Sequence, residues 1–84
     1  MRGNVPRVAE VDGATVAIYF QDHQPPHFHA RFAEHHVVIA IADLSILKGE
    51  LPRPQMRAVV LWAAANSALL NKWWDQAQLG EAFP

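Results

Sequence analysis

The sequence predicts an α+β fold in which an antiparallel sheet of four or five strands packs against one long C-terminal helix. Apolar residues alternate along the first half of the chain, and in the last third they recur at helical spacing. A length of 84 residues allows one hydrophobic core, so residues 1–84 are expected to form a single domain. The chain has no cysteine, which excludes thiol chemistry and disulfides.

The expected strands occupy the first half of the chain. Val5–Val11 is predicted as an edge strand, because Pro6 cannot donate a hydrogen bond to a neighbouring strand. Asp12-Gly13 then favours a tight turn. The other expected strands are Thr15–Phe20, His27–Phe32, His36–Ala42 and Leu44–Lys48.

Alternation along His27–Phe32 divides its side chains between two faces. The inward set is Phe28, Ala30 and Phe32, and the outward set is His27, His29 and Arg31. To place the apolar residues of the next strand on the same face, we expect Phe32 to lie opposite Val37. The same register places Ala40 opposite His29 and leaves Glu34-His35 as the hairpin loop.

The predicted helix begins near Pro54, a favourable first helical residue, and ends near Leu79 before Gly80. Its apolar stripe consists of Met56, Val59, Val60, Ala63, Leu70, Trp74 and Ala77. Asn66-Ser67 offers a point at which the helix could divide, but one continuous helix is expected.

Trp73 and Trp74 are adjacent, and adjacent helical residues point about 100° apart. At least one indole is therefore expected at the exposed edge of the apolar stripe, where aromatic side chains favour partner contacts. The sequence predicts a small protein partner or a second copy of the chain at the Trp73/Trp74 region.

Charge and hydropathy restrict the environment and the partners. The net charge is −1 with scattered basic residues, so there is no overall nucleic-acid-binding signature. No apolar run reaches the roughly 20 residues that span a bilayer, and the N-terminus lacks the apolar centre of a secretory signal. We expect a cytoplasmic protein without membrane contact.

The segment from Asp22 to His29 contains three of the five histidines and two adjacent prolines. Imidazole titrates near neutral pH and can act as proton shuttle or metal ligand. The prolines stiffen the chain where the histidines need fixed positions. This histidine segment is the predicted site.

Around this segment the chain resembles a bacterial family known only as a domain of unknown function, serial number four-one-six-zero. The matching residues run from about Ala17 into the helix: Tyr19-Phe20, Asp22-His23, Pro25-Pro26-His27-Phe28-His29-Ala30, Val37–Ile41 and Gly49-Glu50-Leu51-Pro52. The alanine-rich Ala63-Ala64-Ala65 and the tandem Trp73-Trp74 depart from the family pattern. The resemblance implies no established activity. It does imply one component of a two-protein, toxin–antitoxin-like module acting through protein binding, which is the favoured functional expectation.

The residues themselves leave three interpretations of the histidine segment open, and whether the protein is an enzyme stays undecided. In the first, His23, His27 and His29 bind zinc or another first-row divalent metal, with Asp22 as a further ligand or orienting group. Such a site suits a metal-dependent phosphodiesterase or ribonuclease.

The second interpretation is metal-free acid–base catalysis on a phosphodiester. His27 and His29 exchange protons with the substrate, and Arg31 holds the phosphate. This interpretation predicts RNA as a partner, and Tyr19 is available to stack on a base. In the third interpretation the segment is structural and the domain carries no chemistry, with Asp22 and the prolines fixing a turn.

Overall fold

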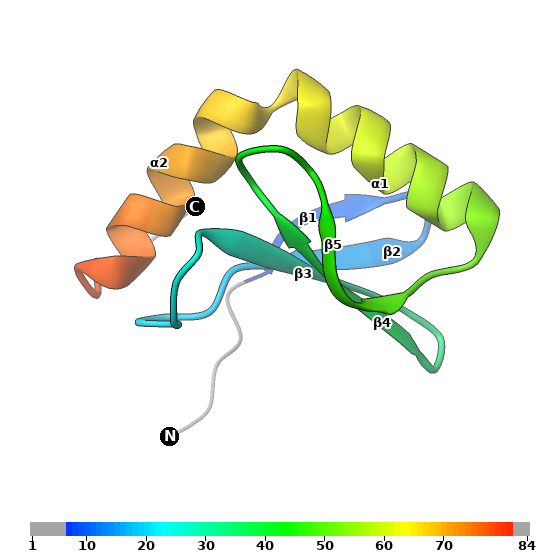
Figure 1. Ribbon diagram of the computed structural model, residues 1–84, viewed down its shortest axis with the longest axis horizontal. Coiled ribbons are helices and arrows are strands. Elements are labelled where there is room, and N and C mark those ends of the chain that lie inside the picture. Colours follow the sequence, from blue (N-terminus) through cyan, green and yellow to red (C-terminus); the bar gives the residue numbers. More distant parts are fainter. Residues whose placement is uncertain (1–6, 82–84) are drawn as a thin grey trace.

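The computed structural model describes residues 7–81 and shows a five-stranded antiparallel sheet, in the order β1-β2-β3-β4-β5, with two helices over one face (Figure 1). The elements are β1 (Arg7–Val11), β2 (Ala14–Ala17), β3 (His27–Phe32), β4 (His35–Ala40), β5 (Ile46–Glu50), α1 (Arg53–Ala65) and α2 (Ser67–Gln78). The α+β class and the antiparallel sheet are confirmed. β1 lies at an edge, as expected. Pro6, from which the edge position was inferred, lies outside the described residues.

The core lies between the inner face of the sheet and the two helices. Its fully buried side chains include Val16 and Ile18, Phe28 of β3 and Ile39 of β4, together with Leu70 of α2. Burying an aliphatic or aromatic side chain of this size contributes about 1.5–3 kcal/mol to folding. Between residues 7 and 81, no helix is both long enough and apolar enough to cross a membrane.

The central hairpin has a register that differs by two residues from the predicted one. His29 lies opposite Val38, and Phe32 lies opposite His35, so the loop is Ala33-Glu34. Ala33 adopts a positive φ of 54°, which tight two-residue hairpin turns require, although no Gly, Asn or Asp indicates such a turn here. A shift of two preserves the face of every side chain, so the predicted inward residues Phe28 and Ala30 are buried.

The prediction of one long helix is wrong, because the chain leaves helical geometry at Asn66. This residue has φ −125° and ψ 27°, and its side-chain Nδ2 donates a hydrogen bond to the carbonyl oxygen of Trp62 at 2.8 Å. The asparagine side chain thus competes with the backbone for a helical acceptor. The resulting bend between α1 and α2 directs α2 past the end of the sheet where β3 begins (Figure 1).

The expectation that Trp73 or Trp74 reaches an exposed edge is also wrong, since only 8% and 3% of their surfaces are exposed. The reason is that α2 is covered on a second side by the loop before β3. The backbone amide of Gln21 donates to the carbonyl of Ala77, and the ring of Trp74 lies 5.1 Å from the ring of His27. The two indoles therefore form no exposed docking surface.

Gly49 in β5 is a position at which only glycine fits. Its φ is +77°, and an added Cβ would meet the carbonyl oxygen of His36, with the carbonyl carbon at 3.1 Å. Gly80 has a similar φ of +74° but has no atom within 4 Å of that position. We expect Gly49→Ala to lower the free energy of unfolding by about 1–3 kcal/mol more than Gly80→Ala. Urea denaturation of both variants measures this difference. Equal decreases in the free energy of unfolding would contradict the predicted clash with the carbonyl group of His36.

Candidate metal centre

Three side chains of the predicted segment converge on one point at the start of β3. Asp22 lies in the loop between β2 and β3, and His27 and His29 are the first and third residues of β3. The side chain of Gln78 in α2 fixes this loop by donating a hydrogen bond to the carbonyl oxygen of Asp22 at 3.0 Å. The carboxylate is therefore positioned by both the loop and α2.

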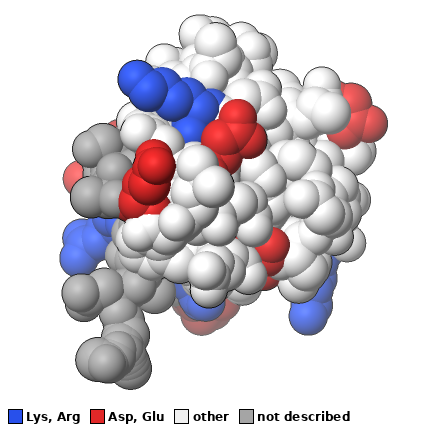
Figure 2. Space-filling model, turned by 90° about the vertical axis from the view of Figure 1, so that its left-hand side faces the viewer, with Lys and Arg blue, Asp and Glu red and all other residues white. Residues whose placement is uncertain are grey.

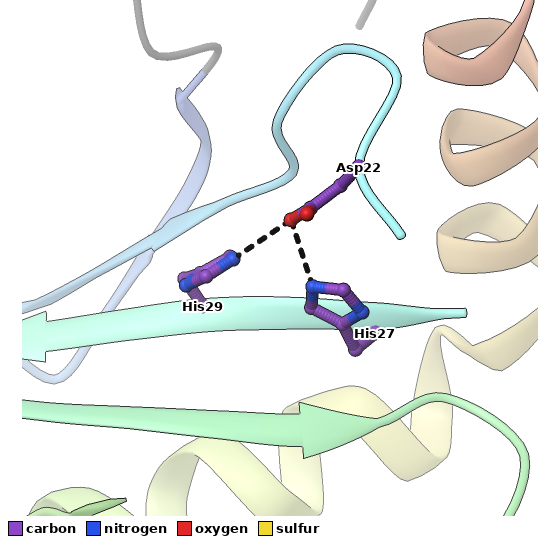
Figure 3. Close-up of side chains that lie close together, drawn as sticks. All are labelled: Asp22, His27 and His29. Carbon is purple, nitrogen blue, oxygen red and sulfur yellow. Dashed lines mark hydrogen bonds and ion pairs between the residues drawn. The ribbon is translucent and has the colours of Figure 1, made fainter. Parts of the chain in front are cut away.

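A single oxygen of Asp22 faces both imidazoles (Figure 3). Its Oδ2 is 2.8 Å from Nε2 of His27 and 3.3 Å from Nε2 of His29. All three potential ligand atoms lie within 4.8 Å of one another. Two atoms bound to one tetrahedral zinc at about 2.0–2.1 Å are about 3.3 Å apart. The 3.3 Å between Oδ2 and Nε2 of His29 therefore matches a mononuclear metal site, whereas the 2.8 Å between Oδ2 and Nε2 of His27 is a hydrogen-bond distance that a bound metal would lengthen.

The other ring nitrogens are held by neighbouring groups. Nδ1 of His27 lies 2.7 Å from the carbonyl oxygen of Pro25, and Nδ1 of His29 lies 3.0 Å from Nε2 of His36. The ring of His29 also stacks on the ring of Tyr19 at 4.0 Å and lies nearly parallel to the ring of His36, whose centre is 5.2 Å away. Metal-binding histidines usually have their second nitrogen fixed in this way, which sets both the tautomer and the ring orientation.

The hydrogen-bonding partners of His27 impose a condition on its protonation. Both of its nitrogens face oxygen atoms, the carbonyl of Pro25 and the carboxylate of Asp22, and neither oxygen carries a hydrogen when Asp22 is ionised. A neutral imidazole has only one N–H. The 2.8 Å between Nε2 and Oδ2 is a hydrogen-bond distance, so a proton lies between these two atoms, and a metal ion bound by both would replace it.

His27 is more enclosed than expected for an outward-facing residue, because only 1% of its surface is exposed. Its side chain does point away from the Phe28 face, but Trp74 and the Asp22 loop cover it. The side chains of Asp22 and His29 keep 17% and 12% of their surfaces exposed. Access to the triad is therefore past Asp22 and His29 and not past His27.

A cavity of about 290 Å³ opens beside His29. Its walls are formed by four histidines and three residues of β4 and β5: His23, His27, His29, His36, Val38, Leu47 and Lys48. Ligand sites in proteins commonly start at about 300 Å³, so this cavity suits a small molecule.

Two of the predicted site residues do not join the triad. Nε2 of His23 is 3.7 Å from Oδ1 of Asp22, but its side chain is 83% exposed, so it lines the cavity without belonging to the triad. Arg31 lies on the same strand as His29 but is exposed and does not line the cavity. The phosphate contact predicted for Arg31 therefore has no support from its position.

His36 is a site residue that the sequence did not indicate. It lies diagonally across from His29, because His29 is opposite Val38 and His36 is two residues earlier on β4. The predicted register placed Ala40 opposite His29, which moved His36 out of reach. A correct turn assignment at Ala33-Glu34 is the one signal that would have identified this pair.

The electrostatics of the site favour an ionised Asp22 carboxylate and the neutral forms of His29 and His36. Partial burial opposes ionisation of Asp22, but hydrogen bonds from the His23 backbone amide and from the two imidazoles outweigh it, so the pKa of Asp22 lies below its usual value. Burial lowers the pKa of His29 and exceeds the opposing effect of its hydrogen bond to Asp22. Burial also lowers the pKa of His36, and the cations Arg31 and Lys48 lower it further.

These shifts predict that the metal-free protein loses stability in mild acid. His29 and His36 bind fewer protons when folded than when unfolded, so the free energy of unfolding decreases as pH falls through the unfolded histidine pKa of about 6.5 towards their folded values. Urea denaturation at pH 7.5 and 5.5 in the presence of a chelator measures the effect. His29→Gln should reduce the pH dependence of the free energy of unfolding. A wild type that becomes more stable as pH falls would contradict the lowered histidine pKa values.

The charged side chains on the face that contains α2 are few and of both signs (Figure 2). Among the described residues, this face therefore shows no basic patch of the kind that binds nucleic-acid backbones.

The fold and the site together define a class: an α+β domain whose sheet carries a carboxylate–imidazole cluster at one end. The chain belongs to the family described as Domain of unknown function (DUF4160), whose family model matches residues 13–75. The family resemblance recognised in the sequence is thus confirmed. No curated protein and no solved structure matches the chain.

Proposed function

We propose that this protein binds a first-row divalent metal ion, with zinc as the first candidate, through Asp22 and the Nε2 atoms of His27 and His29. One observation carries the proposal: Oδ2 of Asp22 lies 2.8 Å from Nε2 of the buried His27 and 3.3 Å from Nε2 of His29, so three potential ligand atoms converge. A metal ion bound there would replace the hydrogen bonds that join Oδ2 to the two imidazoles and would use Nε2 of both His27 and His29.

The donor set selects the class of metal. Imidazole suits zinc, copper, iron and nickel, whereas magnesium and calcium prefer oxygen ligands. Two histidines and one carboxylate leave coordination positions open, as in catalytic rather than structural sites. The cavity beside His29 provides space for a water or a substrate at those positions.

An open metal position supports hydrolytic chemistry, because a bound zinc lowers the pKa of its water towards 7. Among the functions predicted from the sequence, the geometry therefore favours the metal-dependent hydrolase over metal-free acid–base catalysis, whose phosphate contact relied on Arg31. The role in a toxin–antitoxin-like pair and the cytoplasmic location stay predictions. Burial of Trp73 and Trp74 removes the surface at which a partner was expected, whereas the protein-binding role itself was implied by the family resemblance.

Isothermal titration with zinc tests the proposal on the intact chain. We expect one equivalent to bind to the wild type, and His29→Gln to weaken binding at least tenfold. His35→Gln is the matched control, because His35 lies on β4 but lines neither the triad nor the cavity. If the wild type does not bind zinc, cobalt or nickel, the site is a structural ion pair instead.

A further inference from the structure

The cavity beside the triad has a charge distribution that selects its ligand. Asp22 is the acidic residue at this site, and no acidic residue lines the cavity itself. Lys48 projects from β5 to line the cavity, and within residues 7–81 it has no carboxylate at ion-pair distance. Its ammonium group is therefore available to an anion that enters the cavity.

We propose that the cavity binds a small phosphate ester, with its phosphate bridging the metal ion and Lys48. The inference rests on the proposed metal site. A divalent ion beside one carboxylate leaves one unit of positive charge, and Lys48 supplies another. A phosphate monoester carries close to two negative charges at pH 7, so it neutralises both. Metal ions and lysine ammonium groups are common partners of phosphate oxygens.

The other walls of the cavity provide for the organic part of the ester. Val38 of β4 and Leu47 of β5 line it together with the histidines, and Leu47 is 45% exposed. A hydrophobic group attached to the phosphate would cover this surface, and the burial of apolar area favours binding. The cavity of about 290 Å³ has room for a phosphate and one ring.

Lys48 rather than Arg31 is the cation assigned to the phosphate. Both lie near enough to His36 to lower its pKa, so both are near the site. Only Lys48 lines the cavity, whereas Arg31 extends from the exposed end of β3. This pair therefore offers a matched comparison of two cations that differ in their access to the ligand.

The test uses the full chain loaded with one equivalent of cobalt, whose visible absorption reports a change in its ligands. Phenyl phosphate, inorganic phosphate and benzoate are titrated into the wild type, Lys48→Gln and Arg31→Gln. We expect phenyl phosphate to bind more tightly than inorganic phosphate, because of Val38 and Leu47. Lys48→Gln should weaken phenyl phosphate about fivefold or more, and Arg31→Gln less than twofold.

The outcomes separate this inference from the metal site itself. If cobalt binds but phenyl phosphate leaves its spectrum unchanged, or if benzoate binds as tightly, the phosphate assignment is wrong and the metal site stands. Equal losses of phenyl phosphate affinity in Lys48→Gln and Arg31→Gln would also contradict the assignment of the phosphate to Lys48. If cobalt does not bind to the wild type, both the metal site and this inference fail.

Discussion

Replacing Asp22 with asparagine is expected to lower the affinity for zinc at least about a hundredfold, since altering groups that only hydrogen-bond to a ligand already costs 10–100-fold. The substitution keeps the size of the side chain but removes the charge on the oxygen at which His27 and His29 converge. Competition against a chelator of known affinity measures the loss.

Asp43→Asn provides the control for this experiment. Asp43 is an exposed aspartate that accepts hydrogen bonds from Ser45 in the turn before β5 and belongs to no metal cluster among the described residues. Its substitution should leave zinc affinity unchanged within twofold. Zinc binding that survives in Asp22→Asn, or is lost equally in Asp43→Asn, would show that the ion binds elsewhere.

Replacing Trp74 with alanine is expected to lower the free energy of unfolding by about 3–5 kcal/mol, which is typical of a buried tryptophan. Trp74 is 3% exposed, belongs to the core and lies against the ring of His27. For an 84-residue chain this is a large part of the total stability, which is about 5–15 kcal/mol for small domains. Thermal or urea denaturation measures the effect.

Leu61→Ala is the control for Trp74→Ala, because Leu61 is an apolar helical residue that is 66% exposed. Its loss should change stability by no more than about 0.5 kcal/mol. Trp74→Phe keeps an aromatic ring beside His27 and should retain a folded protein in which zinc binding can be measured. Similar decreases in the free energy of unfolding in Trp74→Ala and Leu61→Ala would contradict the packing of α2 over the histidine site.

Periodicity in the sequence was sufficient to predict the sheet. Strand β3 has the predicted bounds, His27–Phe32, because alternation around Phe28 and Ala30 is unbroken between two turn segments. The register of the hairpin was not predictable in the same way, since Ala33 adopts a turn conformation that its residue type does not favour. The bend at Asn66 depends on one side-chain hydrogen bond, which apolar spacing does not reveal.

The candidate site was predicted in part. Asp22, His27 and His29 were grouped from one short segment, because alternation on a strand places two residues of the same parity on one face. The enclosure of His27 by Trp74 and the contact between His29 and His36 depend on chain segments distant in sequence. Such contacts follow from the helix bend and the hairpin register, and these were the two features that local patterns left undetermined.

The most direct test of a metal between the carboxylate and the imidazoles is a long-range ¹H–¹⁵N NMR correlation of the histidine rings, recorded with and without one equivalent of zinc. We predict that Nε2 of His27 and of His29 shifts on zinc addition to the position of a metal-bound nitrogen, while Nδ1 of each ring carries the proton. If the resonances of His27 and His29 do not respond to zinc, and the shifts are confined to the exposed His23 or the half-buried His35, the proposed centre is wrong.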